Sequence, residues 1–388
     1  MEFKSALCSD SDPAVLTRSI CDQLSTIPRP DLVVLFISSR LNYAFERIVT
    51  EVRRRTGCEH LLACNAQSVL GDTRELESQT AVSALAMAMP SARITPFRLD
   101  DNRWQELLTD PDALSEALAT SEDTRCLLLL GDPFTTPITQ LLELISTQWP
   151  HVPVIGGMTS GIRAAGESRM AIDDRIYRAG AVGAAIAGPV QIDCVVSQGC
   201  RPIGQSMTIT AAHDNVIEKL DDVPPIEIIT ELHSNLTPVD QLAVEKRGLL
   251  IGRVIDQRKG TYARGDFLVR NILDADRTKG SISIGDMVSA GQIVQFHVQD
   301  AQTATEDLNL LLQGHMLLAD KPRGALMFSC NGRGERLFGR PNHDVAAVQD
   351  MLGPLPLAGF FAAGELGPVG RSNFIHGQTV CIAMFNNG

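Results

Sequence analysis

The sequence has little positive charge, few aromatic side chains and no long apolar run, and each shortage excludes a class of function. Its formal net charge is −12, and the one basic run is Arg53, Arg54 and Arg55, so no basic stripe is present to bind a phosphate backbone. Two Trp and three Tyr form no platform for stacking bases. No stretch approaches the roughly 20 apolar residues that span a bilayer. We therefore expect neither nucleic-acid binding nor membrane insertion.

Cysteine pairs, metal-binding spacings and a leader segment are missing as well. The nine Cys form no CxxC pair and lie mostly in apolar runs, which is typical of reduced thiols packed as small hydrophobes. Cys58, His60 and Cys64 have no fourth ligand nearby, so we expect no metal site. No GxxxxGK loop or other cofactor motif is present, and we expect no cofactor. Residues 1–12 lack the pattern of a signal peptide, which predicts a cytoplasmic protein.

A repeated pattern is what the sequence does contain. Residues 124–162 and 323–369 each begin with a short apolar run that ends in a glycine-containing turn. Apolar residues then recur at helical spacing, and Pro-x-x-Gly with a glycine-rich loop follows. Residues 31–71 form a weaker third copy. Three strand-helix-strand units predict an α/β protein built by duplication, in which backbone comes close to a ligand or a neighbouring strand at the glycines.

Further elements are expected around the repeats. Asp12 and Pro13 predict the start of a first helix, and apolar spacing predicts helices within 79–90 and 103–120. The runs AVGAAIAG and VQIDCVV, joined by Gly188 and Pro189, predict a hairpin. Alternating residues from 249 to 298 predict a meander of antiparallel strands, followed by a helix that Asp300 caps.

These elements predict two α/β domains with mixed sheets flanked by helices. We place an N-terminal helix in residues 1–29, a first domain in 30–225 with two repeats, and a second domain in 226–388 with the meander and the remaining repeat. A layered α-β-β-α sandwich is a variant of the same fold class.

Several phrases together carry a family resemblance. They are SQGCRPIGQ at 197–205, GDFLVRNIL at 265–273, GQIVQFHVQDAQTATEDL at 291–308 and PLAGFFAAGELGPV at 356–369. The chain resembles the FIST family, whose paired FIST-N and FIST-C domains are named for F-box and intracellular signal transduction proteins. The resemblance covers about residues 30 to 385 and implies a non-catalytic sensor of small ligands, with amino acids the suggested class. The first 30 residues are too few for an F-box, so we expect a stand-alone form that signals through another protein.

The sites implied by this resemblance cluster near the end of the chain. Where the family has a GCSTxGE-like loop after the first repeat, this chain has ACNAQSVLG, and no Glu follows its glycine, whereas GFFAAGELG keeps Glu365. Cys330, Asn331 and Arg333 lie in a turn after an apolar strand. We expect Arg333 to clamp a carboxylate and Glu365 to bind an ammonium group. The alternative is a salt bridge between these two residues that pins two loops together.

Other candidate ligand-binding residues lie in apolar surroundings. Arg270 and Asn271 interrupt the apolar strand FLVRNIL, so Arg270 requires either a ligand or a structural partner such as Asp266 or Glu306. Phe361 offers an apolar wall to a ligand, or else packs in the core. The predicted ligand is a small charged metabolite, bound in a cleft between the two domains whose closure reports binding.

Two functions of other classes stay open on the sequence. Cys330, with His376 as base and Glu365 orienting the imidazole, would suit a cysteine-dependent hydrolase or transferase. The spacing of these residues does not require such a site, because catalytic residues are neighbours in space and not in sequence. A protein-interaction scaffold without any ligand is the third possibility.

Overall fold

The first strand-helix-strand unit follows the sequence pattern in the computed structural model, which describes residues 1–387. β2 (Leu32–Ser38) and β3 (His60–Ala66) are parallel and are joined by η1 (Ser39–Ala44), a short 3-10 segment, and α2 (Phe45–Thr56). Alternate residues of β2 pack into two different cores, as period-two alternation requires of a strand buried on both faces.

The other two predicted units are present in the same form. The second consists of β8 (Thr124–Gly131), α5 (Ile138–Gln148) and β9 (Val154–Met158). The third consists of β20 (Gly324–Cys330), α9 (Glu335–Phe338), α10 (His343–Leu352) and β21 (Leu357–Ala362). In both units the two strands are parallel. The predicted α/β class and its internal repeats are therefore confirmed.

A hairpin and a returning strand follow each unit. The first set is β4 (Val69–Gly71), β5 (Arg74–Leu76) and β6 (Ala81–Ala88); the second is β10 (Met170–Ile172), β11 (Arg175–Tyr177) and β12 (Ala181–Ala187); the third is β22 (Glu365–Val369), β23 (Ser372–His376) and β24 (Thr379–Asn387). Each hairpin pairs with the second strand of a different unit: β4 with β21, β10 with β3, and β22 with β9. The three units are therefore interlocked in a cycle.

One more strand precedes each unit and completes three six-stranded sheets. These strands are β1 (Glu2–Ser9), β7 (Arg93–Leu99) and β13 (Val190–Gln198). The sheet orders are β1-β6-β2-β3-β10-β11, β7-β12-β8-β9-β22-β23 and β13-β24-β20-β21-β4-β5. The same order of equivalent strands occurs in all three sheets, which is what duplication of one module produces.

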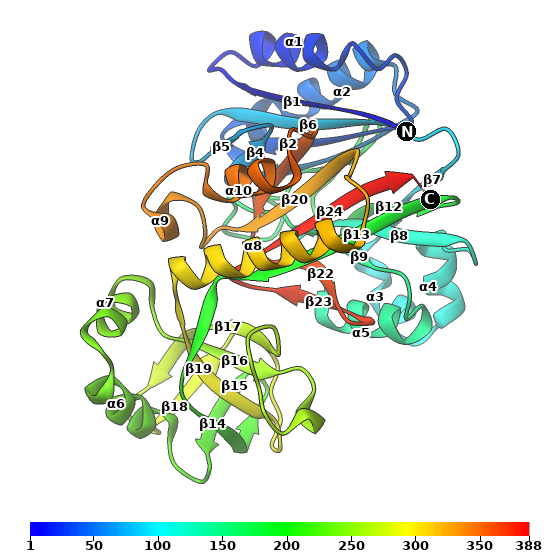
Figure 1. Cartoon of the computed structure of the whole chain (residues 1–388). Helices are drawn as coiled ribbons and strands as arrows, with labels where there is room; N and C mark the ends of the chain where they lie inside the picture. Colours follow the sequence, from blue (N-terminus) through cyan, green and yellow to red (C-terminus); the bar gives the residue numbers. More distant parts are fainter. Residues whose placement is uncertain (388) are drawn as a thin grey trace. The chain divides into compact units, whose positions relative to one another are not determined.

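The three sheets share one core. Their inner faces contribute to a single apolar cluster, in which Phe36, Phe328 and Phe360 meet with ring centroids 5.0 to 6.2 Å apart. Helices cover the outer faces. α1 (Pro13–Leu24) and α2 cover the first sheet, and α3 (Trp104–Thr109), α4 (Pro111–Ala117) and α5 cover the second (Figure 1).

The chain folds into two compact units. Unit 1 comprises residues 1–196, 309–375 and the described chain from 379 onward, and it contains all three repeats. Unit 2 comprises residues 197–308 and 376–378. It is therefore inserted into the third repeat, and the sequence-based boundary at residue 225 falls inside it. α8 (Ala301–Leu318) passes from unit 2 into unit 1.

Unit 2 is a closed barrel of antiparallel strands with two helices. Its strands, in barrel order, are β14 (Cys200–His213), β15 (Val216–Leu220), β18 (Ser281–Ile284), β17 (Phe267–Asp276), β16 (Leu250–Val254) and β19 (Ile293–Gln299). Its helices are α6 (Pro225–Asn235) and α7 (Pro238–Arg247). The predicted antiparallel strands after residue 249 are present, and β14 and β15 close them into the barrel.

Two local predictions were wrong, and a third was right in type but not in the number of helices. Residues 81–88 form β6 and not a helix, because Val82 and Leu85 fall on opposite faces of a strand held between β1 and β2. Residues 104–117 form two helices, since Asp110 ends α3 and caps α4 ahead of Pro111. β12 and β13 are not a hairpin, because β7 and β8 already occupy both edges of β12.

In residues 1–387, no helix is long and apolar enough to cross a membrane.

Candidate functional site

The third repeat brings polar side chains together at one edge of its sheet. β20 and β21 are parallel, and Cys330 at the end of β20 is in register with Ala362 at the end of β21. Residues that follow the two strands therefore meet at the same edge, where ligands commonly bind in parallel sheets. Arg333 follows β20, and Glu365 begins β22 after a turn at Gly364.

Arg333 is completely buried and forms an ion pair with Asp344. Its Nε and Nη2 atoms donate hydrogen bonds of 2.7 and 2.8 Å to the two carboxylate oxygens of Asp344, which lies in the first turn of α10. The guanidinium also lies 5.3 Å from the ring centroid of Phe338. Burial alone would lower the pKa of Arg333, but the charge and the hydrogen bonds of Asp344, together with Cys330 and Glu365, outweigh burial and raise that pKa. The predicted alternative partner, Glu365, is not the ion-pair partner here.

Glu75 and His343 extend this network. Glu75, from the hairpin strand β5 of the first repeat, accepts hydrogen bonds of 2.9 and 3.0 Å from the backbone N–H groups of Asp344 and Val345. It thus places a carboxylate at the N-terminus of α10. Burial raises the pKa of Glu75 to about 7, and the Asp344 charge adds to that effect. His343 stacks on Phe338 with ring centroids 3.4 Å apart.

Glu365 is a second fully buried ionisable residue at this edge. Its Oε2 atom accepts hydrogen bonds from the hydroxyl and the backbone N–H of Thr379, at 2.8 and 3.3 Å. Burial raises the pKa of Glu365 to about 8, although Thr379, Arg333 and Cys330 each act to lower it. Cys330 is 9% exposed. We call Glu75, Cys330, Arg333, Asp344 and Glu365 the β20–β21 cluster.

Several buried polar atoms in and beside this cluster have no hydrogen-bond partner within the described chain. They are Arg333 Nη1, Glu365 Oε1, Glu75 Oε2 and Asn331 Oδ1. Most buried polar groups in proteins are paired, so an unpaired set at one edge of a sheet makes this edge the candidate site. The set combines a cationic donor with carboxylate acceptors.

Five of the predicted ligand-binding residues lie in unit 1. Cys330, Arg333 and Glu365 belong to the cluster, and Asn331 follows Cys330, with its backbone N–H 3.1 Å from the carbonyl oxygen of Ala362. Phe361 is buried in β21, where its backbone pairs with Ser68 and Ser160. The sequence thus predicted residues that fold to one sheet edge.

Arg270 and Asn271 lie in unit 2. The Nε atom of Arg270 lies 3.2 Å from Oδ2 of Asp286, so the predicted structural partners of Arg270, Asp266 and Glu306, were wrong. Those two acids pair instead with Lys259 and Arg264, which lie nearer to them in the fold. Asn271 accepts a hydrogen bond from Gln378, at 3.2 Å.

His376 also belongs to unit 2, whereas Cys330 and Glu365 belong to unit 1. Within residues 1–387, no group of three or more His, Cys, Asp or Glu side chains is arranged to hold a metal ion.

Sequence reasoning missed Glu75, Asp344, His343 and Thr379. The one sequence feature that indicates any of them is Asp344 in the first turn of the helix after Pro341. Acidic residues are common at that position because they interact favourably with the helix dipole, so the feature does not indicate a site. Nothing in the sequence indicates that Glu75, 269 residues away, contacts the same turn.

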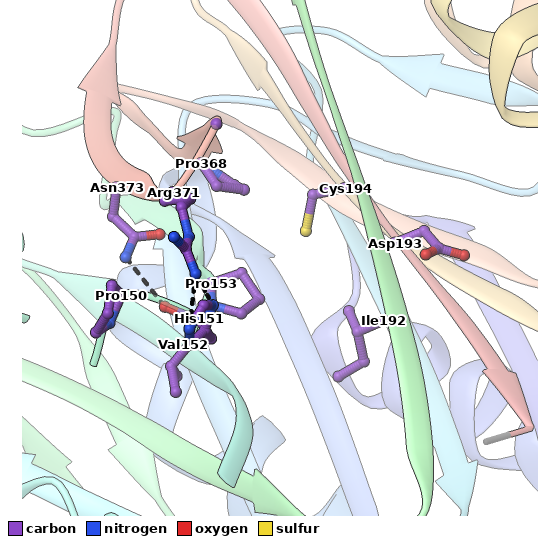
Figure 2. Close-up of a pocket in the computed structure, with 11 residues that line it drawn as sticks. Pro150, His151, Val152, Pro153, Ile192, Asp193, Cys194, Pro368, Arg371 and Asn373 are labelled. Atoms are coloured by element: carbon purple, nitrogen blue, oxygen red, sulfur yellow. Dashed lines mark hydrogen bonds between the residues drawn. The ribbon is translucent and has the colours of Figure 1, made fainter. Parts of the chain in front are cut away.

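A surface pocket of about 330 Å³ lies elsewhere in unit 1 (Figure 2). Its polar groups are already engaged: Arg371 contacts the ring of His151, and Asn373 hydrogen-bonds to the backbone of Val152 and Val154. None of the predicted ligand-binding residues lines it. The buried cluster, with its unpaired atoms, is therefore the stronger candidate.

These features define an α/β protein with a buried polar site at the carboxyl ends of a parallel strand pair. The model of the FIST N domain matches residues 31–223, and that of the FIST C domain matches residues 231–368. The chain belongs to the FIST family, whose domains are associated with sensing in signal transduction.

Similar proteins occur in mycobacteria. An uncharacterized protein of Mycobacterium tuberculosis (strain H37Rv) is 40% identical over 327 residues, covering 84% of this chain and 83% of that protein. An uncharacterized protein of Mycobacterium bovis is 37% identical over 358 residues, covering 92% of this chain and 90% of that protein. A solved cyanuric acid hydrolase covers 100% of both chains at 10% identity, but its TM-score of 0.36 is too low to support an argument.

Proposed function

We propose that this protein is a non-catalytic sensor of a small zwitterionic ligand, with amino acids the expected class, and that the ligand binds at the β20–β21 cluster. The observation that carries the proposal is the buried, unpaired Arg333 Nη1 in the same cluster as the buried, unpaired Glu365 Oε1. Burying polar atoms without partners costs free energy, and a ligand that pairs with both removes that cost.

The chemistry of the cluster favours a ligand with two charged ends. A ligand carboxylate would accept from Arg333 Nη1, the one guanidinium nitrogen that Asp344 leaves unpaired. An ammonium group would pair with Glu365. Because burial holds the pKa of Glu365 at about 8, Glu365 is mostly protonated at neutral pH, and a bound cation would favour its ionised form. Binding should therefore release a proton near pH 7.

The location of the cluster suggests how binding reaches a partner. Its members come from the β5 hairpin of the first repeat and from β20, α10 and β22 of the third. A bound ligand would therefore contact segments that are far apart in the sequence and hold them together. Stabilising the N-terminus of α10 is the local change that a downstream signalling protein would read. Arg270 and Asn271 stay predicted ligand-binding residues.

A thermal-shift screen tests the proposal. The purified chain is heated with each of the twenty amino acids, with dicarboxylates and with polyamines, at millimolar concentration and constant ionic strength. We expect a saturable rise in Tm with one zwitterionic class, growing as RT ln(1 + [L]/Kd). Glu365→Gln should lose that rise, whereas Arg371→Ala, in the pocket of Figure 2, should keep it. A flat screen, or a shift that Arg371→Ala removes and Glu365→Gln does not, would refute this site.

A cysteine-dependent hydrolase or transferase stays the alternative function. The observation in its favour is the side-chain hydrogen bond between the Cys330 thiol and Glu365, which places a nucleophile beside a carboxyl group. A catalytic thiolate reacts much faster than structural thiols. Iodoacetamide that labels Cys330 ahead of Cys8 and Cys194, the two cysteines that are only partly buried, would favour the enzyme.

A further inference from the structure

The C-terminal half of α8 presents an unusually apolar outer face. Ala304, Leu308 and Leu312 are completely buried and form the inner face of the helix. Beyond residue 309, where α8 enters unit 1, four leucines are exposed: Leu310 by 64%, Leu311 by 38%, Leu317 by 80% and Leu318 by 90%. α8 is the long yellow-orange helix of Figure 1.

These four leucines form one stripe with Gly314 at its centre. At about 100° per residue, Gly314 lies opposite the buried Leu312. Leu310 and Leu317 then lie together on one side of Gly314, and Leu311 and Leu318 on the other. A Cβ atom added at Gly314 would meet nothing within 4 Å, so the middle of the stripe is open space. We call residues 310, 311, 314, 317 and 318 the α8 stripe.

The α8 stripe is symmetric about Gly314. Its leucines lie four and three residues before the glycine and three and four residues after it. A two-fold axis through Gly314 would bring Leu310 against Leu318 of a second copy, and Leu311 against Leu317. Isologous interfaces require this reciprocity, in which residue i meets j and j meets i. The missing side chain at Gly314 would let two helix axes approach to the near end of the usual 8–10 Å range.

The charge and the area of the α8 stripe also favour contact with a second copy of the chain. Residues 308–319 contain no Asp, Glu, Lys or Arg, although the chain carries a net charge of −12 that would otherwise keep two copies apart. The four leucines of the stripe present on the order of 500 Å² of apolar surface per copy. Two copies would bury about 1,000 Å², which is the lower limit for a specific interface.

We infer that the protein forms a homodimer in which the α8 stripes of two copies pack antiparallel across a two-fold axis at Gly314. This inference does not depend on the proposed ligand site, because the stripe shares no residue with the β20–β21 cluster.

The molecular mass in solution is the first test. Light scattering after size exclusion, from about 1 to 100 µM protein, should give about 84 kDa, twice the 42.0 kDa of one chain, at the upper concentrations. Leu318→Glu should lower the mass to that of the monomer and leave the circular-dichroism spectrum unchanged, since the residue is almost fully exposed. Met287→Glu, at a position 62% exposed outside the stripe, should remain a dimer. A wild-type monomer at 100 µM, or a Leu318→Glu dimer, would overturn the inference.

Mixing two variants tests the antiparallel register. Leu310→Lys and Leu318→Glu should each be monomeric alone, because a charge replaces an apolar contact on both sides of the axis. Their equimolar mixture should form a heterodimer, in which Lys and Glu meet once and the two native leucines meet once. Monomers in that mixture, with both variants folded by circular dichroism, would contradict the proposed register. A Leu310→Lys dimer on its own would contradict the stripe as the interface.

Discussion

At the scale of single residues, the β20–β21 cluster holds two opposite charges in direct contact with each other and buried away from water. The Arg333 guanidinium and the Asp344 carboxylate form two parallel hydrogen bonds, and neither side chain is more than 2% exposed. Such a pair offsets the desolvation of each ion only while both partners are present. Despite burial, the Arg333 charge holds the pKa of Asp344 well below its usual range.

Removing Arg333 should therefore be costly to stability. Arg333→Ala leaves the Asp344 charge buried without its partner, and we expect a loss of about 3–5 kcal/mol in the free energy of unfolding. Urea unfolding followed by circular dichroism measures it. Arg54→Ala is the matched control, because Arg54 pairs with Glu51 at an exposed surface, and we expect no measurable change there. A loss below about 1 kcal/mol for Arg333→Ala would show that Asp344 does not depend on this pair.

Glu365 should make stability depend on pH in the opposite sense to an ordinary ion-paired carboxylate. Its pKa in the folded protein is about 8, against 4.5 for a glutamate side chain in water, so between these values the folded state binds more protons than the unfolded state. The stabilisation from protonated Glu365 is complete below about pH 4.5 and is lost as pH rises through 8.

The urea midpoint of the wild type should consequently fall from pH 6 to pH 8.5. Glu365→Gln, which stays neutral, should flatten part of that fall, and the remainder belongs to Glu75, whose pKa is raised to about 7. Identical pH profiles for wild type and Glu365→Gln would contradict the raised pKa.

At the scale of elements, much of the fold follows from local patterns. Apolar runs with helical segments between them correctly predicted the three strand-helix-strand units, and Asp300 caps α8 as predicted, accepting a hydrogen bond from Thr303 N–H at 2.7 Å. β6 was mistaken for a helix because Val82, Leu85 and Met89 also suit helical spacing. Its strand form depends on β1 and β2, which flank it, and such tertiary pairing overrides a short local pattern.

The glycines of the second strands have a structural role that tests the strand pairing. Gly359 in β21 is in register with Met327 of β20, and a Cβ atom at Gly359 would lie 1.7 Å from the Met327 carbonyl oxygen. Gly359→Ala should force the two strands apart and cost about 1–3 kcal/mol in the free energy of unfolding. Gly285→Ala, where the nearest atom is 4.0 Å away, is the control in the same urea experiment. Equal midpoints for both variants would mean that β20 and β21 do not pair in this register.

At the scale of the whole molecule, the exchange of hairpins among the three sheets explains why the site was only partly predictable. The β4–β5 hairpin of the first repeat pairs with β21 of the third, and this brings Glu75 to the N-terminus of α10. No single sequence reveals a strand pairing across nearly 290 residues, because the pattern of each strand is satisfied by any apolar neighbour. Cys330, Arg333 and Glu365 were accessible to prediction because they follow strands of one repeat.

The division of the chain into two units was also only partly predictable. The sequence indicated two domains, and the chain forms two compact units, but all three repeats share the core of unit 1 and the barrel is an insertion. Alternating strands such as β16 and β17 predict antiparallel pairing with each other. Closure of the barrel also requires β14, which begins about 50 residues before β16 and pairs with β19.

The central claim is that a small zwitterionic ligand binds between Arg333 and Glu365, and isothermal titration calorimetry tests it most directly. The amino acid that gives the largest thermal shift is titrated into wild type and Glu365→Gln at pH 7, in two buffers of different ionisation enthalpy. We predict one saturable site in the wild type with release of a proton, and at least tenfold weaker binding without proton release in Glu365→Gln, which corresponds to about 1.4 kcal/mol or more. Absence of saturable heat, or equal Kd and equal proton release in both proteins, would contradict the claim.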